Sequence, residues 1–302
     1  MTTAPLRRTI RTSAELDLQA TLRPVRRGRG DPTTRLGHRE LLRAMRTPVG
    51  PATLHLRQEG DSVEATAWGE GAGWALEQSP ALLGGDDDLG GFDPSAGLVR
   101  ELHRRNPGLR IGRTGLVFEA TVPAVLEQRV TGFEARRSFA QIARRYGEPA
   151  PGPGELWLLP EPAVMASTPY FALHPLGVER SRADTLRRAA AAATRLEALA
   201  GVPAAQARER LRTVPGIGVW TAAEVAAVAF GDPDAVSVGD YHLKNVISYA
   251  LAGEPRGTDE RMLELLEPYA GHRGRVCRLI ESAGIGAPRR HPRQRVQRIA
   301  RL

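Results

Sequence analysis

The fold of the second half of this chain is decided by one stretch, Leu211-Arg-Thr-Val-Pro-Gly-Ile-Gly-Val-Trp-Thr-Ala222. It predicts that one helix ends, that Pro215–Gly218 forms a tight hairpin, and that a second helix begins at once. Gly216 and Gly218 let the backbone turn with a positive φ and approach another chain closely. The amides that start the second helix then point outward and can hold one nucleic-acid phosphate, while Ile217 anchors the hairpin in the core. The alternative is an ordinary corner between two helices.

A second motif follows about one helix and one loop downstream. Trp220 comes directly after the hairpin, and the segment Val236-Ser-Val-Gly-Asp-Tyr-His-Leu-Lys244 has Asp240 after a glycine. Asp240 stands at the expected start of the next helix, where the commonest role of an aspartate is to cap that helix. The functional interpretation is a carboxylate at the mouth of a groove whose phosphate clamp is the hairpin. For Trp220, the alternative is a core aromatic residue beneath the hairpin.

Helical patterns dominate from about residue 115 to residue 285. Pro123 at a first-turn position predicts a helix, and Thr131-Gly-Phe-Glu134 is a capping box that starts another, which ends at Tyr146. Apolar residues at helical spacing predict further helices at 182–200, 203–211, 219–230, 241–250, 259–266 and 272–283. Short connections between so many helices predict a compact all-α bundle.

The first 95 residues are typical of an α/β structure with strong β content. Residues 16–22, 52–57 and 62–68 alternate between apolar and polar side chains, and a Gly-containing turn joins the last two segments. The predicted fold class is therefore α+β and mostly α, with a helix-hairpin-helix motif in a two-lobed helical part. The predicted domains are an N-terminal antiparallel α/β domain at 1–110, a helical domain at 111–230, and C-terminal helices with a basic tail at 231–302.

Composition restricts the class of protein and its partner. The 302 residues carry 42 Lys+Arg against 34 Asp+Glu, a formal charge of +8, and the pI is near 10.5. All basic residues except Lys244 are arginine, and the balance favours nucleic acid ahead of a membrane surface as the partner. The single cysteine, Cys277, excludes a disulfide framework, a Cys-rich zinc site and a four-thiolate cluster, and it indicates a reducing compartment. No apolar run is long enough for a membrane span, and a signal peptide is not expected.

Three other stretches favour structural interpretations. Gly69-Glu-Gly-Ala-Gly73 lacks the glycine spacing of a phosphate loop and predicts a turn. Asp86-Asp-Asp88 could bind a cation, but we favour a solvated loop because consecutive carboxylates rarely converge on one ion. The basic tail at 288–301 could touch phosphates, and we favour a loosely held terminus.

The hairpin and the downstream aspartate together resemble the helix-hairpin-helix DNA glycosylase superfamily, in which a Gly/Pro-rich hairpin precedes an essential aspartate. Within it, Pro-Gly-Ile-Gly-x-Trp-Thr-Ala at 215–222, followed by Asp240-Tyr241, is similar to the bacterial inducible 3-methyladenine DNA glycosylase II (AlkA-like) group. Leu126-Glu-Gln-Arg-Val-Thr131 looks like that group's Leu-x-Gln-x-Val-Ser segment, and residues 22–31 are similar to part of its N-terminal domain. The resemblance covers most of the chain.

The resemblance implies roles for individual residues. Asp240 matches the catalytic aspartate, which stabilises an oxocarbenium-like state and can orient water. Trp220 and Tyr241 match aromatic residues that line the pocket for a flipped-out base, and Gln128 is assigned to the same pocket. Gln128 and Arg129 match the position of the wedge that fills the gap left by that base. The family residue expected at the second position is leucine, so Arg129 either stacks in the gap or grips a phosphate.

The resemblance also implies how DNA is held. The residues expected to contact DNA lie on and around the hairpin: Pro215, Gly216, Ile217, Gly218, Thr221, Arg129 and Lys244. The main-chain carbonyls of Arg212, Val214 and Ile217 match a structural monovalent-cation site. No cofactor is required, and neither zinc nor an iron–sulfur cluster is expected. The expected partner is double-stranded DNA with a damaged base, bound by a monomer in the cytoplasm, associated with the nucleoid.

The implied function is a monofunctional DNA glycosylase. It would hydrolyse the N-glycosidic bond of flipped alkylated purines of the 3-methyladenine type in base excision repair. In lyase relatives a lysine lies just past the hairpin, where this chain has Trp220, so strand cleavage is not expected. Two alternatives stay open: a non-catalytic helix-hairpin-helix protein that only grips DNA, and a glycosylase for another lesion on the same fold.

Overall fold

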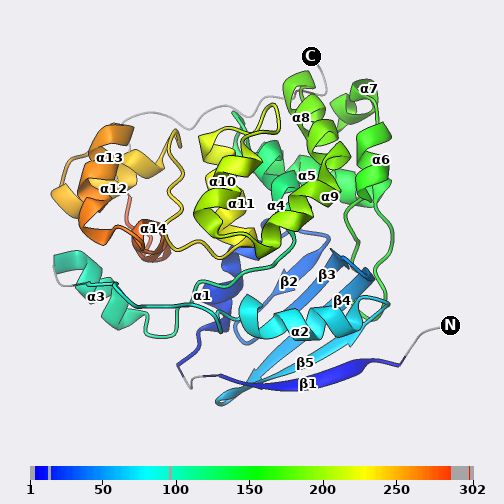
Figure 1. Ribbon diagram of the computed structural model, residues 1–302, viewed down its shortest axis with the longest axis horizontal. Helices are drawn as coiled ribbons and strands as arrows, with labels where there is room; N and C mark the ends of the chain where they lie inside the picture. The colour runs from blue at the N-terminus through cyan, green and yellow to red at the C-terminus, as the bar shows by residue number, and fades with distance from the viewer. Residues whose placement is uncertain (1–3, 13–14, 95–96, 287–298, 300–302) are drawn as a thin grey trace.

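The computed structural model describes residues 4–12, 15–94, 97–286 and 299. Figure 1 shows a sheet in blue beneath a group of helices coloured from green to red. The strands are β1 (Leu6–Arg11), β2 (Thr34–Leu36), β3 (Glu40–Thr47), β4 (Gly50–Glu59) and β5 (Ser62–Trp68). They form one antiparallel sheet in the order β1-β5-β4-β3-β2. The predicted fold class, α+β and mostly α with an N-terminal antiparallel sheet, is confirmed.

The hairpin predicted from alternating side chains is present as β4 and β5. Glu59 pairs with Ser62 across the turn. Alternate residues of β5 are buried: Val63, Ala65 and Ala67. They share an apolar cluster with α2 (Ala72–Leu82), which packs on β1, β4 and β5. The alternation in the sequence therefore reflects a sheet with one face covered by a helix.

The strand predicted at 16–22 is wrong, because Leu18–Leu22 form the helix α1. Asp17 caps this helix by accepting a hydrogen bond from Ala20 N at 2.8 Å. Leu18 and Leu22 are both buried and stand four residues apart, so the same leucines fit one face of a helix. A short apolar segment of this kind is ambiguous between helix and strand.

The remaining helices form two groups, each around its own apolar cluster. The first group surrounds one apolar cluster and comprises α4 (Val117–Leu126), α5 (Gly132–Tyr146), α6 (Pro162–Ser167), α7 (Tyr170–Leu173), α8 (Arg180–Ala191), α9 (Ala193–Glu197), α10 (Ala204–Leu211) and α11 (Val219–Ala229). The second group comprises α3 (Gly97–Arg105), α12 (Leu243–Ala252), α13 (Asp259–Leu266) and α14 (Arg273–Ser282). The 3-10 turns are Arg23–Val25, His174–Leu176, Ala198–Gly201 and Glu267–Tyr269. The helices predicted between 203 and 283 are all present, whereas the predicted helix 182–200 is divided into α8 and α9.

Helix α4 lies at the centre of the first group and contacts α5, α8, α9 and α11. All its residues except Glu119 are buried. The predicted helix start at Pro123 is wrong, because Pro123 lies inside α4. The helix begins at Val117, where the Glu197 carboxylate of α9 accepts hydrogen bonds from the amides of Val117 (2.9 Å) and Phe118 (2.8 Å). A cap supplied from 80 residues away leaves no local signal in the sequence.

The capping box predicted at the start of α5 is confirmed. Thr131 N donates to Glu134 Oε2 at 2.9 Å, and Glu134 N donates to Thr131 Oγ1 at 3.4 Å. Gly147 follows the last residue of the helix, and its amide donates to Ala143 O at 3.0 Å. Because both ends are set by neighbouring residues, α5 begins and ends where the sequence predicts.

Helix α3 packs on α14, so part of the N-terminal segment shares its apolar core with the C-terminal helices. Four residues join that core: Val99, Leu102, Leu109 and Ile111. The division into domains at 1–110, 111–230 and 231–302 stays a prediction. The apolar core shared by α3 and the C-terminal helices includes residues on both sides of its first boundary.

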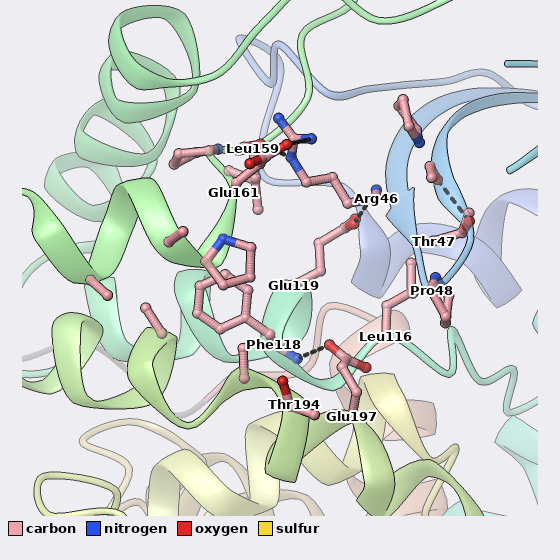
Figure 2. Close-up of a pocket in the computed structure, with 18 of the residues that line it drawn as sticks. Arg46, Thr47, Pro48, Leu116, Phe118, Glu119, Leu159, Glu161, Thr194 and Glu197 are labelled. Atoms are coloured by element: carbon pink, nitrogen blue, oxygen red, sulfur yellow. Dashed lines mark hydrogen bonds and ion pairs between the residues drawn. The ribbon is translucent and has the colours of Figure 1, made fainter. Parts of the chain in front are cut away.

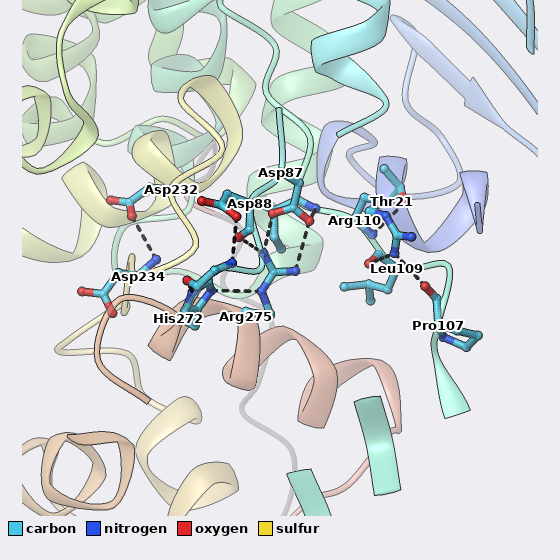
Figure 3. A network of polar contacts seen from close by, with 12 residues as sticks. Thr21, Asp87, Asp88, Pro107, Leu109, Arg110, Asp232, Asp234, His272 and Arg275 are labelled. Atoms are coloured by element: carbon cyan, nitrogen blue, oxygen red, sulfur yellow. Dashed lines mark hydrogen bonds and ion pairs between the residues drawn. The ribbon is translucent and has the colours of Figure 1, made fainter. Parts of the chain in front are cut away.

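A buried ion pair fastens the same two parts of the chain together, as Figure 3 shows. Arg275 on α14 pairs with Asp87, and both side chains are only 2% exposed. Asp87 Oδ2 accepts hydrogen bonds from Arg275 Nη1 (3.1 Å) and from the amide of Ile111 (2.9 Å). The interpretation of Asp86–Asp88 as a solvated loop is therefore wrong for Asp87. Its partner lies 188 residues away, where no local pattern reveals it.

Two further expectations concern the ends and the surface of the chain. The basic tail at 288–301 lies outside the described residues except for Ile299, which is buried. Within the described ranges, no helix has both the length and the apolar character needed to cross a bilayer. In the glycine-rich segment 69–73, residues 69–71 form the predicted turn, and Ala72 and Gly73 already belong to α2.

Candidate active site

The hairpin between α10 and α11 forms the tight turn that the sequence predicts. Ile217 N donates to Val214 O at 3.0 Å, and the Ile217 side chain is buried. Gly216 has a φ of +100°, and a Cβ there would lie 2.0 Å from Thr185 Oγ1 on α8. Gly218 instead has a φ of −91° and open space around it. The expected positive φ is therefore present at Gly216 and absent at Gly218.

The start of α11 presents backbone amides at the surface. Gly218 is the N-cap of this helix, and no side chain caps it. The residues of the turn that are exposed are Pro215, Gly216, Gly218 and Val219. The first amides of a helix lack partners within the helix and lie at the positive end of its dipole. This hairpin is therefore chemically suited to hold a phosphate.

The loop between α4 and α5 is tied to the hairpin. Gln128 Nε2 donates to Gly216 O at 3.0 Å and to Thr221 Oγ1 at 2.8 Å. Thr221 is 2% exposed, so its side chain faces the protein interior. Arg129 is exposed and has a φ of +55°, which is uncommon for a residue with a side chain. Gln128 thus holds an exposed Arg129 beside the hairpin.

Asp240 uses both of its carboxylate oxygens. Oδ1 accepts hydrogen bonds from the amides of His242 (2.7 Å) and Leu243 (2.8 Å), at the start of α12. Oδ2 accepts a hydrogen bond from Trp220 Nε1 at 3.3 Å. The capping role and the functional role are therefore compatible, because one oxygen caps α12 while the other faces Trp220. A carboxylate held in one orientation can stabilise a developing positive charge without reorganising.

The two aromatic residues expected in the pocket have different surroundings. Trp220 is half-buried, so it is not the fully enclosed core residue of the alternative interpretation. Tyr241 is 78% exposed, and its ring packs edge-on against the neighbouring His242. The Lys244 ammonium lies 3.6 Å from Asp259 Oδ2. The structure brings Trp220 against Asp240 and leaves Tyr241 at the surface.

Two further carboxylates, which the sequence did not indicate, belong to this region: Glu224 contacts the loop that carries Asp240, and Glu281 interacts with the charge of Asp240. Glu224 stands one helical turn after Trp220 and accepts a short hydrogen bond from Ser237 Oγ. Burial raises the pKa of Glu224 to about 7. Burial and the charge of Asp240 raise the pKa of Glu281 on α14. The four-residue spacing from Trp220 could have indicated Glu224, whereas no pattern in the sequence connects α14 with this site.

A separate cavity of about 690 Å³ lies among the β3–β4 turn, α6, α8 and α9, as Figure 2 shows. The charged side chains that line this cavity form hydrogen bonds with other parts of the protein. Arg46 Nε donates to Leu159 O at 2.6 Å, and Glu197 caps α4. None of the site residues expected from the sequence lines this cavity.

The described part of the chain contains no group of three or more His, Cys, Asp and Glu side chains that could hold a metal ion. Cys277 is buried, and this burial raises its pKa far above the ordinary value. A monovalent cation at the carbonyls of Arg212, Val214 and Ile217 stays a prediction. Of these carbonyls, that of Val214 already accepts the hydrogen bond of the turn.

Known proteins share both the sequence and the fold of this region. Residues 122–270 match the family model described as "HhH-GPD superfamily base excision DNA repair protein". The DNA-3-methyladenine glycosylase 2 of Escherichia coli (strain K12) is 33% identical over 150 residues, which are 49% of this chain and 53% of that protein. The chain therefore spans about half the length of this curated relative.

Solved structures match over nearly the whole chain. A 3-methyladenine DNA-glycosylase from Archaeoglobus fulgidus has a TM-score of 0.76 at 19% identity and covers 91% of this chain and 97% of its own. The Clostridium acetobutylicum 8-oxoguanine glycosylase/lyase, solved with double-stranded DNA, has a TM-score of 0.69 at 12% identity. The match covers 94% of this chain and 99% of that protein's chain. The hairpin, Trp220 and Asp240 all lie within the matched family region. Residues 122–270 of this chain are thus a domain of the HhH-GPD superfamily of base excision DNA repair proteins.

Proposed function

We propose that this chain is a monofunctional DNA glycosylase that hydrolyses the N-glycosidic bond of alkylated, 3-methyladenine-type purines in double-stranded DNA. The observation that carries the proposal is a fixed Asp240 carboxylate bonded to Trp220, directly beside a hairpin suited to hold phosphate. The family of the domain and the name of its Escherichia coli relative support this activity. In this proposal the active form of the protein is a monomer that acts on nucleoid DNA in the cytoplasm.

In the proposed complex the hairpin binds the DNA backbone. The amides around Gly216 and Gly218 bond one phosphate, and this contact carries no sequence information. Arg129 lies beside the hairpin, where its guanidinium can fill the gap left by a flipped base or bind a phosphate. Binding is therefore expected to depend on salt concentration more than on base sequence.

The proposed reaction breaks the bond between C1′ of the sugar and the base nitrogen. An alkylated purine already carries positive charge, so it is a good leaving group and needs no general acid. As the bond breaks, positive charge moves to the sugar, where Asp240 Oδ2 stabilises it and orients the attacking water. Trp220 serves this step twice in the proposal, because its N–H orients Asp240 and its ring offers a surface for the base. The hydrolysis uses no cofactor.

The proposal excludes strand cleavage by the enzyme. A lyase step needs an amine that forms a Schiff base with C1′ of the sugar. Lys244 is the only lysine of the chain, and its ammonium pairs with Asp259. Arginine remains protonated and cannot take this role. The expected product is an abasic strand that stays intact until it is treated with alkali.

The test is incubation of the purified chain with a methylated duplex, with released bases identified by chromatography. Release of 3-methyladenine with strands intact before alkali supports the proposal. Tight binding without release would favour the non-catalytic DNA-binding alternative, and release only from a duplex with another lesion would favour the second alternative. A covalent protein–DNA band trapped by borohydride and lost in Lys244→Gln would contradict the monofunctional assignment.

A further inference from the structure

Arg182 on α8 is a buried cation whose hydrogen bonds go to backbone carbonyls. Arg182 is 2% exposed. Its Nη1 donates to Leu126 O at 2.9 Å, and its Nη2 donates to Gly177 O at 3.2 Å. Its Nε is buried and has no hydrogen-bond partner among the residues that the structure describes. A buried charge that is not fully satisfied costs stability, so stability alone does not explain this arginine.

The two carbonyls bound by Arg182 belong to the ends of neighbouring elements. Leu126 is the last residue of α4, where the final carbonyls of a helix have no partners within it. These carbonyls lie at the negative end of the helix dipole, so a cation binds them more strongly than a neutral donor does. Gly177 belongs to the turn just before α8. Arg182 therefore fastens the C-terminal end of α4 to the start of α8.

The loop at 127–130 begins directly after this fastened carbonyl and joins α4 to α5. In its middle, Gln128 Nε2 donates to Gly216 O of the hairpin. At its end, Thr131 starts the capping box of α5. The loop is thus held at its start, its middle and its end, and the exposed Arg129 lies between two of these points.

The same helix, α8, also supports the hairpin between α10 and α11. Thr185 stands one turn after Arg182, and its Oγ1 would lie 2.0 Å from a Cβ at Gly216. One turn further along, Arg188 Nη1 donates to Pro215 O at 3.5 Å. One helix therefore positions both the loop and the hairpin, which are the two elements that hold the DNA backbone and its gap in the proposed complex.

We propose that Arg182 is a positioning residue, which fixes the 127–130 loop so that Arg129 meets DNA beside the hairpin. This inference rests on the DNA contact of Arg129 in the proposed function, and it adds the group that sets the position of that contact. Arg182 itself is buried and acts through the loop. A loop that is ordered before binding does not have to be ordered by the DNA, so its contact is stronger than that of a flexible loop.

The test uses two variants of Arg182 and one control. Arg182→Met removes the charge and both hydrogen bonds, whereas Arg182→Lys keeps a cation that can still bond one carbonyl. The control is Glu197→Gln, which weakens the cap at the other end of α4, about 15 Å away along the ten-residue helix. Thermal unfolding checks that each variant is folded, and the lysine variant carries the test if the methionine variant is not.

Hydrogen exchange of the loop is the first readout, and it needs neither DNA nor activity. The amides of Glu127 and Gln128 donate to carbonyls in the last turn of α4, so their exchange reports opening of the loop. Exchange in a peptide that covers 127–131 is expected to be at least about tenfold faster in Arg182→Met than in the wild type, because hydrogen bonds from a charged donor are lost. Arg182→Lys should lie between the two, and Glu197→Gln should match the wild type.

Duplex binding is the second readout, measured with an abasic analogue in two backgrounds, the wild type and Arg129→Ala. Arg182→Met is expected to weaken binding about tenfold in the wild-type background and to have almost no further effect in Arg129→Ala, because the contact that it positions is already absent there. Arg182→Lys should restore part of the affinity, and Glu197→Gln should match its background in both cases. A role in stability alone would weaken both backgrounds equally, because independent effects add.

The outcomes separate this inference from the proposed function. Faster loop exchange together with non-additive binding supports the inference. A folded Arg182→Met whose loop exchanges at the wild-type rate, or which weakens binding equally in both backgrounds, would overturn the inference and leave the proposed function standing. A wild-type chain that binds the duplex but releases no base would overturn the proposed glycosylase activity and leave the inference standing.

Discussion

Gly216 and Gly218 hold equivalent places in the Gly-x-Gly pattern, yet the structure needs them for different reasons. Gly216 has a positive φ and lies against Thr185, so its backbone geometry and its lack of a side chain are both required. Gly218 has a negative φ, and a Cβ added there would have no neighbour within 4 Å, so it serves the exposed surface of the turn. The sequence indicates the turn, but the distinction depends on α8, which lies far away in the chain.

Substitution of the two glycines by alanine tests this difference. Gly216→Ala is expected to destabilise the protein by about 2–4 kcal/mol, because the new methyl group meets Thr185 and the φ is unfavourable for alanine. Gly218→Ala, the matched control, is expected to cost no more than about 1 kcal/mol, because alanine fits the space but is a poorer N-cap than glycine. Chemical unfolding measures both effects, and equal stability of the two variants would contradict this account of the turn.

In the candidate site, too, some residues are indicated by the sequence around them, and others are placed only by contacts with distant parts of the chain. Asp240 and Trp220 can be predicted because each follows a recognisable turn or hairpin. The contacts of Gln128 and Thr221 with a base and with DNA stay predictions; the hydrogen bond between their side chains was not predictable, and it gives the buried Thr221 hydroxyl a partner. Glu281 could not be predicted, because only the packing of α14 brings it near Asp240.

At the scale of single elements, helices with local caps were predictable and helices with distant caps were not. Thr131 and Glu134 cap α5 from within their own turn, and the predicted start is correct. Glu197 caps α4 from another helix, and the predicted start at Pro123 is wrong. Alternating leucines in α1 were misleading for a similar reason, since five residues are too few to distinguish the two periods.

The two caps are expected to differ in strength. Thr131→Ala should cost about 1 kcal/mol, the usual effect of losing an N-cap side chain. Glu197→Ala should destabilise by about 2–3 kcal/mol, because it leaves two amides of a buried helix without a partner. Glu197→Gln keeps an acceptor and should lose less. Urea unfolding of the three variants provides the comparison, and a larger loss in Thr131→Ala than in Glu197→Ala would contradict it.

At the scale of the whole molecule, the sheet and the two helical groups each have an apolar core, and polar contacts fasten them to one another. The order of these parts was predictable from periodicity and composition. Their contacts were not, because α3 and the Asp87 loop reach the C-terminal helices across most of the chain. This placement matters for the site, since α14 carries both Arg275 and Glu281.

Two neighbouring aspartates test the connection between these parts. Asp87→Asn is expected to destabilise the protein by about 3–5 kcal/mol, because it leaves the buried Arg275 charge without its partner. Asp86→Asn changes a surface pair with Arg113, in which the aspartate is 58% exposed, and should cost no more than about 1 kcal/mol. Thermal unfolding midpoints compare the variants, and similar midpoints for both would show that the buried pair does not stabilise the arrangement.

The most direct test of the central claim is base release by Asp240→Asn. The amide oxygen can still cap α12, so the variant loses the negative charge and the Trp220 hydrogen bond but keeps its shape. Asp17→Asn is the matched control, because Asp17 caps α1 on an exposed surface. We expect Asp240→Asn to bind a duplex with an abasic analogue within about twofold of the wild type and to release 3-methyladenine at least about a hundredfold more slowly. The control should retain both properties, and release by Asp240→Asn at the wild-type rate would contradict the account.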